Sequence, residues 1–116
     1  MIQISNGVVS IKNSSFNKLS SKIYSSLVSL TSNEMTVSFV NVSGFDKTLF
    51  VMSSGDYSFD NVAISNGSNT LLTSYNSVVF DAESVNISLT NSKFRNFSSL
   101  FSSPILYAYN DDSSTY

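Results

Sequence analysis

The sequence contains no cysteine, no histidine and no tryptophan, and it has only one proline and four glycines. Without cysteine, the chain has neither a disulfide framework nor a thiolate metal site. Without histidine, it lacks the commonest metal ligand and the usual general base near neutral pH. The residue types on which most catalytic and metal-binding motifs depend are therefore missing. We expect no catalytic residue, no metal site and no cofactor.

Charged residues are also scarce. They make up 12% of the 116 residues, about half of the ~25% that is usual in globular domains. The net charge of −2 and the scattered positions of the six basic residues argue against a nucleic-acid partner, which requires a basic surface. The longest apolar run, residues 49–52, is far below the ~20 residues of a membrane helix. We therefore expect neither a nucleic-acid partner nor a membrane span.

Serine, asparagine and threonine are abundant, with 28, 13 and 7 copies respectively. These residues cover strand surfaces and form turns, and serine and asparagine are poor helix formers. Strand signals, in contrast, run through the whole chain. We therefore expect an all-β protein.

One short pattern occurs four times: apolar, any, apolar, any, asparagine, and then another apolar residue. The copies are Val9–Asn13 with Phe16, Val37–Asn41 with Phe45, Tyr57–Asn61 with Ile64, and Ile87–Asn91 with Phe94. Alternation with a period of two predicts strands, and recurrence every 20 to 30 residues predicts a repeat protein. Further strands are predicted at residues 26–30, 48–52, 77–80 and 104–109. The units lie near residues 5–33, 34–55, 56–83 and 84–112, and each has the length of one coil of a β-solenoid.

The four asparagines are expected at corners, because asparagine tolerates the left-handed backbone region. In stacked coils, we expect Asn13, Asn41, Asn61 and Asn91 to form an internal ladder of hydrogen-bonded amides. The residues beside the ladder would stack from coil to coil, with Ile11 on Phe39 and Phe16 on Phe45. If the amide of Asn61 is buried in this way, Asn61→Ala destabilises the fold by ~1–3 kcal/mol.

This pattern resembles that of right-handed parallel β-helix proteins of the pectate-lyase-like superfamily, over about residues 7–110. The resemblance implies short parallel sheets on each coil and an internal asparagine ladder. The second copy departs from the pattern, with one extra residue between Asn41 and Phe45. The fold class that we predict is a right-handed parallel β-helix of about four coils, residues 1–116 being one segment of a longer repeat protein. The alternative is an antiparallel β-sandwich, which also has many short strands with Ser/Asn/Gly turns.

The positions of the acidic residues indicate whether the chain could be part of an enzyme. By resemblance, polysaccharide-cleaving members gather two or three carboxylates on the outer face of one sheet, and glycoside hydrolysis needs two of them across the bond. Only Asp81 and Glu83 share a strand face, and the residues equivalent to Asp60 are not acidic. A polysaccharide lyase or glycoside hydrolase fragment would bring Asp60, Asp81 and Glu83 together in one groove. We expect instead that they are scattered, solvated acids.

Two further signals concern glycans. Asn-x-Ser sequons occur at Asn13, Asn41, Asn66, Asn86 and Asn96, which is close to the number that this composition gives by chance. The ladder would turn Asn13 and Asn41 inward, so Asn66, beside a glycine, is the best acceptor. Tyr107 and Tyr109 share a strand face and could stack on a sugar, although that face is also typical of a core.

We interpret the chain as a structural or adhesive β-helix module without catalytic activity, located outside the cell or at its surface. The alternatives are the enzyme fragment and a glycan-binding module. Its partners would be carbohydrates or other surface proteins. Open solenoid ends expose unpaired strand edges, so we also expect these ends to be covered by end-to-end self-association or by further coils.

Overall fold

The computed structural model describes residues 2–20, 26–69, 77–99 and 105–109, and within these residues it is all-β. Its strands are β1 (Ile2–Ser5), β2 (Val8–Leu19), β3 (Ser26–Phe45), β4 (Thr48–Asn69), β5 (Phe80–Thr90), β6 (Lys93–Ser99) and β7 (Leu106–Tyr109). Every strand pair described is parallel, including β2 with β3, β3 with β4, and β4 with both β5 and β6. The predicted parallel β-solenoid is confirmed and the antiparallel sandwich is excluded.

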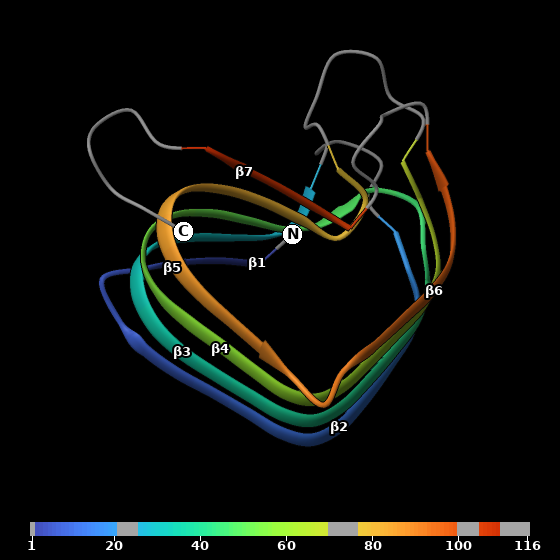
Figure 1. The fold of residues 1–116 in the computed structure, drawn as a ribbon, viewed down its shortest axis with the longest axis horizontal. Coiled ribbons are helices and arrows are strands. Elements are labelled where there is room, and N and C mark those ends of the chain that lie inside the picture. Colours follow the sequence, from blue (N-terminus) through green and yellow to red (C-terminus); the bar gives the residue numbers. More distant parts are fainter. Residues whose placement is uncertain (1, 21–25, 70–76, 100–104, 110–116) are drawn as a thin grey trace.

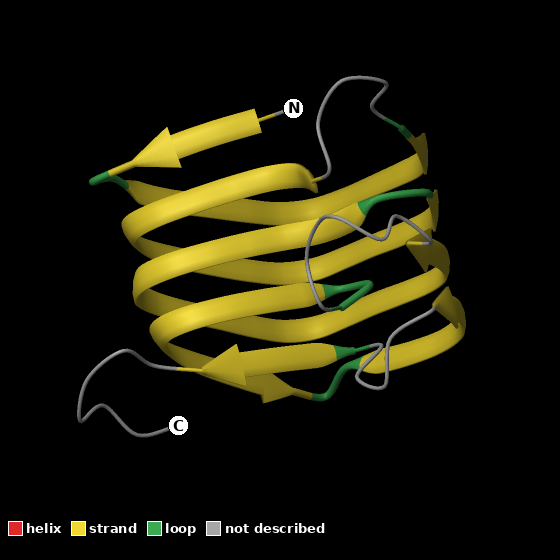
Figure 2. Ribbon diagram, turned by 90° about the horizontal axis from the view of Figure 1, so that it is seen from above, coloured by secondary structure: helices red, strands yellow, loops and turns green. Residues whose placement is uncertain are grey.

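The chain winds through about three turns, with successive coils lying directly on one another (Figure 1). Seen from the side, the long strands run as stacked bands (Figure 2). Ile11 pairs with Val37, Val37 with Phe59, and Phe59 with Leu89. These four paired residues mark four levels of the stack, and the three turns between them differ in length, with 26, 22 and 30 residues. The prediction of about four coils is therefore corrected to about three turns.

Each coil bends at residues that adopt the left-handed conformation, with φ between 50° and 84°, and at one corner of β4 Gly55, with φ 113°, follows such a residue. The first corner consists of Asn6, Ser32, Ser54 and Ser84, the second of Asn13, Phe39, Asn61 and Asn91, and the third of Lys18, Gly44, Asn66 and Asn96. We call the strand segments before the first corner the first side, those between the first and second corners the second side, and those after the second corner the third side. One left-handed residue turns an extended chain without ending its pairing, so β3 and β4 continue around the corners.

Side chains alternate between the interior and the surface along each side, as the period-two pattern predicts. On the second side, Met35, Val37, Tyr57 and Phe59 are buried, whereas Glu34, Thr36 and Asp56 between them are exposed. Rings from two successive strands, β4 and β5, meet inside, where the centroids of Phe59 and Phe80 are 4.9 Å apart and those of Phe50 and Phe80 are 5.5 Å apart. Stacking of the coils therefore builds a continuous apolar core that no single coil could bury.

The second coil is in a different register from the predicted one. Val37 pairs with Ile11 rather than with Val9, a shift of two residues. Phe16 therefore stacks on Val42, not on Phe45, and Ile11 stacks on Val37, not on Phe39. A shift of two keeps the alternation of inward and outward residues in phase, whereas a shift of one would invert it. Val37 and Phe45 are buried as predicted, but Phe39, which the shift places at the corner, and Asn41 are exposed.

A small polar cluster lies inside the core. Thr48 Oγ1 donates to the Ser77 carbonyl at 2.6 Å, and Asn69 Nδ2 donates to Thr48 Oγ1 at 2.6 Å. The hydroxyl of Ser77 in turn donates to the carbonyl of Phe80. All three side chains are fully buried. These bonds connect the start and the end of β4 to the segment before β5. Breaking any of them would leave a buried polar group unpaired, which is costly.

Candidate functional site

The outer surface of the second side is a regular array of mostly polar side chains, which we call the polar face. Three outward rows cross the coils: Val8, Glu34, Asp56 and Asn86; Ser10, Thr36, Ser58 and Ser88; and Lys12, Ser38, Asp60 and Thr90. Neighbouring residues in a row are about 4.8 Å apart and neighbouring rows about 6.6 Å apart, as the spacing of strands and of alternate residues requires. The middle row consists only of hydroxyl side chains.

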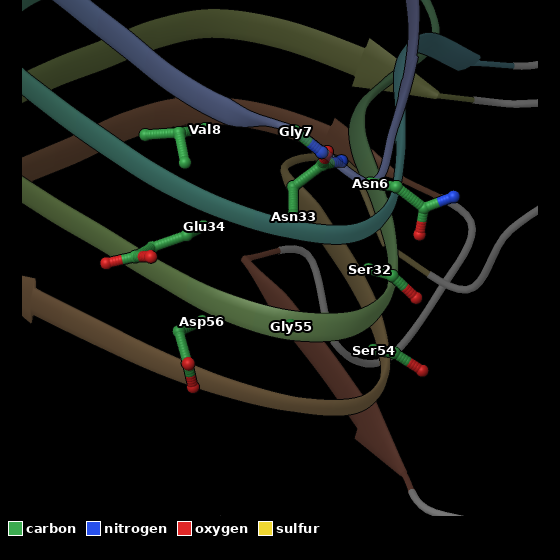
Figure 3. A pocket seen from close by; sticks show the side chains of 9 residues that line it. All are labelled: Asn6, Gly7, Val8, Ser32, Asn33, Glu34, Ser54, Gly55 and Asp56. Carbon is green, nitrogen blue, oxygen red and sulfur yellow. The ribbon is translucent and has the colours of Figure 1, made fainter.

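A groove of about 480 Å³ follows the first corner beside the polar face (Figure 3). We call it the corner groove; it is lined by Asn6, Gly7, Val8, Ser32, Asn33, Glu34, Ser54, Gly55 and Asp56. In Figure 3, Val8, Glu34 and Asp56 project from successive coils along one wall, and Ser32 and Ser54 lie on the other. The groove therefore has acids on one side and hydroxyl groups on the other, with small residues between them.

Asn33 fixes the floor of this groove. Its side chain is buried, with only 3% exposed, and it reaches back to the first coil. Its Oδ1 accepts a hydrogen bond from the Gly7 amide at 2.9 Å, and its Nδ2 donates to the Ile4 carbonyl at 2.8 Å. Gly55, one coil further on, has φ +113°, and a Cβ there would lie 2.3 Å from the Asn33 carbonyl oxygen. Only glycine fits at that position.

Two acids of the groove lie side by side. Glu34 and Asp56 are partners in the parallel register of β3 and β4, and the amide of Asn86 donates to Asp56 Oδ1 at 2.7 Å. The repeat pattern in the sequence did not indicate this pair. The three residues directly precede Met35, Tyr57 and Ile87, which stack on one another, so a correct alignment of these apolar residues would have revealed the row.

Asp60 is held in place at the other end of the polar face. Its Oδ1 accepts hydrogen bonds from Thr90 Oγ1 at 2.7 Å and from Asn91 Nδ2 at 3.1 Å. Its Oδ2 accepts one from Asn61 Nδ2 at 3.2 Å. The bond from Thr90, followed by that from Asn91, lowers the pKa of the Asp60 carboxyl below its ordinary value, because both bonds favour the charged form.

The structure does not bring together the acids that the enzyme alternative requires. Asp60 pairs with Thr90 on the second side. Asp81 and Glu83 pair with Val51 and Ser53 on the first side, before the corner at Ser84. Asp81 is buried, with 4% exposed. Within the described residues, no group of three or more Asp, Glu, His or Cys side chains could hold a metal ion.

The four asparagines predicted to form the internal ladder are all exposed. Asn13, Asn61 and Asn91 do occupy one corner, with φ near 50°, because asparagine accepts the left-handed conformation. Asn41 does not: it pairs with Ser15 and Ala63 in the middle of the third side. The inward orientation of the ladder is therefore corrected, since a left-handed corner residue points its side chain outward here.

Asparagines do bond from coil to coil at the third corner, where Asn96 Nδ2 donates to Asn66 Oδ1 at 3.3 Å. These two residues belong to sequons, and so do Asn13, Asn41 and Asn86. All five are exposed, so the expectation that Asn13 and Asn41 are inaccessible is wrong. On β7, Tyr107 is 37% exposed, while the side chain of Tyr109 lies outside the described residues.

The apolar interior is open at the level of the first coil. A cavity of about 360 Å³ there is lined mainly by apolar side chains, among them Ile4, Val9, Ile11, Phe16 and Leu19. The described part of the chain contains no helix that could cross a membrane. No family model, curated protein or solved structure matched this chain. The fold and the polar face are therefore the basis for any functional conclusion.

Proposed function

We propose that the chain is a structural or adhesive module of an extracellular or cell-surface β-helix protein, without catalytic activity, that presents its polar face to a partner surface. The observation that supports this most is the in-register hydroxyl row of Ser10, Thr36, Ser58 and Ser88. A flat array with a fixed spacing can match a repeating surface. Its short side chains lose little rotamer freedom on contact, so their binding cost is low.

As part of the same proposal, we infer that the repeat is related to those of the pectate-lyase-like superfamily and that the protein is located outside the cell. Support comes from parallel coils with asparagines at corners, including Asn13, Asn61 and Asn91. Proteins of this architecture offer long lateral surfaces to polysaccharides and to other surface molecules. The polar face, which runs the length of the stack, is the corresponding surface in this chain.

End-to-end self-association has a steric condition. Within one chain, β1 leads directly into β2 at the same level of the stack, and both pair with β3. At the other end, β7 already occupies the position beneath the start of β5. A second copy can therefore place its β2 beneath β5 only if its β1 replaces β7. We therefore propose end-to-end self-association only in a form in which β1 of one copy replaces β7 of the other.

Adsorption measurements test the adhesive function. A quartz microbalance would compare binding of the purified chain to films of cellulose, chitin and an extracellular-matrix protein. Thr36→Lys with Ser58→Lys places two long charged side chains on the polar face. The matched control, Ser43→Lys with Ser65→Lys, makes the same change at outward positions of the third side. We expect the wild type and the control to bind at least one film and the polar-face variant to lose roughly 10-fold in affinity.

The proposal fails if the wild type adsorbs to none of the films, or if both double variants lose binding equally. The enzyme alternative has one observation in its favour, the adjacent Glu34 and Asp56 in the corner groove. A reducing-end assay on the same polysaccharides decides it. Release of new reducing ends by the wild type, lost in Glu34→Gln or Asp56→Asn, would replace the adhesive function by a catalytic one.

A further inference from the structure

Phe39 breaks the pattern of the second corner. The other three coils have asparagine there, Asn13, Asn61 and Asn91, with φ of 51°, 53° and 50°. Phe39 adopts the same left-handed conformation, with φ +54°, and leaves 61% of its surface exposed. A bulky aromatic residue is strained in this region, and an exposed ring contributes little to the core. Neither feature stabilises the chain, which is typical of a residue kept for binding.

The surroundings of Phe39 are polar and fixed. Its neighbour Ser38 pairs with Asp60 on the next coil, so the backbone at Phe39 lies one strand spacing, about 4.8 Å, from the backbone at Asn61. The Asp60 carboxylate is oriented by Thr90 and Asn91 from one coil further on. We call these six residues, Ser38, Phe39, Asp60, Asn61, Thr90 and Asn91, the corner patch. It combines one apolar ring with an oriented carboxylate, amides and hydroxyls.

An aromatic ring and a carboxylate on one surface favour a ligand that has both an apolar face and hydrogen-bond donors. The face of an aromatic ring carries negative charge density and attracts the positively polarised C–H groups of an apolar surface laid on it. A carboxylate accepts strong, charge-assisted hydrogen bonds from hydroxyl donors. A sugar ring offers both groups, a C–H face and hydroxyls at its edge. A protein partner fits less well, because the cores of protein interfaces are depleted of charged residues.

We propose that Phe39 and Asp60 form a shallow binding site for a neutral sugar ring, which stacks on Phe39 and donates one hydroxyl hydrogen bond to Asp60 Oδ2, the oxygen that accepts a single bond in the structure. This site deepens the adhesive function proposed above and rests on it, since Ser38, Asp60 and Thr90 belong to the polar face. It also names the partner class, a neutral glycan. Acidic glycans are disfavoured because Asp60 is negatively charged at neutral pH.

A titration followed by two-dimensional amide NMR tests the site. The probes are short neutral oligosaccharides of glucose, mannose, galactose and N-acetylglucosamine, with oligogalacturonate as the acidic control. We expect saturable shifts at residues 38–41 and 60–61 with at least one neutral probe, and none with oligogalacturonate. Phe39→Asn and Asp60→Asn should each weaken binding roughly 10-fold. Phe39→Tyr, which keeps the ring, and Phe16→Asn, which removes a partly exposed ring from the lining of the first-coil cavity, should bind like the wild type.

Stability separates loss of the site from loss of the fold. Phe39→Asn relieves the left-handed strain, so its midpoint of thermal unfolding should rise while its affinity falls. The proposal is overturned if no neutral probe shifts these residues, if Phe39→Asn binds like the wild type, or if Phe16→Asn loses binding equally. If the microbalance shows adsorption that depends on Thr36 and Ser58 but not on Phe39, the adhesive function stands and the sugar site does not.

Discussion

Asn69 donates a hydrogen bond through Nδ2 to Oγ1 of Thr48 at 2.6 Å, inside the core, between the two ends of β4. Both side chains are fully buried. The asparagine that joins parts of the solenoid is thus an interior one, which no repeat pattern indicated. The four asparagines that the pattern did indicate lie at the surface.

Replacing Asn69 should therefore be costly. In Asn69→Ala, the hydroxyl of Thr48 and the carbonyl of Ser77 lose a buried donor, and we expect the free energy of unfolding to fall by ~1–3 kcal/mol. Asn61→Gly is the matched control, because Asn61 is exposed at φ +53° and glycine adopts that conformation freely. It should change stability by less than ~0.5 kcal/mol. Urea unfolding measures both, and an equal loss in the two variants would contradict this assignment.

Gly55 gives a second prediction on the fold. The substitution Gly55→Ala puts a Cβ 2.3 Å from the Asn33 carbonyl oxygen at φ +113°, so the backbone of the corner groove must move. We expect a loss of more than about 1 kcal/mol in the free energy of unfolding. In Gly7→Ala, the nearest atoms are 3.7 Å away or further, and the change should stay within ~0.5 kcal/mol. A tolerated Gly55→Ala would mean that the corner is built differently.

Stability should depend on pH through Tyr57. Burial, with 2% of the residue exposed, is the main cause that raises its pKa above the ordinary value of 10.0. The folded protein therefore holds the phenol proton more tightly than the unfolded chain does. Stability is fully present below about pH 10, the pKa in the unfolded chain, and falls as the pH rises from there through the folded pKa.

Tyr57→Phe provides the comparison. It has no phenol proton to lose, although it also loses the hydrogen bond to the Ser54 carbonyl. Loss of that bond lowers the stability of the variant by a constant amount below pH 10, whereas the difference in slope between the two proteins above pH 10 reports the titration of Tyr57. Urea unfolding between pH 9 and pH 11 should give a steeper decline for the wild type than for the variant. Parallel curves would show that Tyr57 is not the responsible group.

The β-solenoid architecture was predictable because the alternation of apolar and polar residues is enough to indicate it. Alternation such as Met35, Val37 on one coil and Tyr57, Phe59 on the next identifies inward residues even when the register is shifted by two. Corner positions were only partly predictable. Asparagine marks the left-handed region at Asn13 and Asn61, but Ser32, Ser54 and Lys18 adopt it as well, and these residues have no such preference of their own.

The candidate site was not predictable because it depends on the register between coils. Glu34 and Asp56 become neighbours only through the register, and the register depends on how many residues each turn takes, which varies from 22 to 30. The same shift moved Phe39 from its predicted place in the core to an exposed corner. Asn33 and Asn69 have inward side chains because backbone groups there need partners, and this need is not visible in the sequence pattern.

The most direct test of the parallel register uses paired cysteines, which are informative because the chain contains none of its own. Thr36 pairs with Ser58, and Ser58 with Ser88, so their Cα atoms lie about 4.8 Å apart, within the ~4.4–6.8 Å that a disulfide spans. Thr36→Cys with Ser58→Cys, and Ser58→Cys with Ser88→Cys, should each form an intramolecular disulfide under mild oxidation. Thr36→Cys with Ser88→Cys, two coils apart, should stay reduced. Mass spectrometry showing the two neighbouring pairs reduced, or the distant pair linked instead, would contradict the solenoid register on which the account depends.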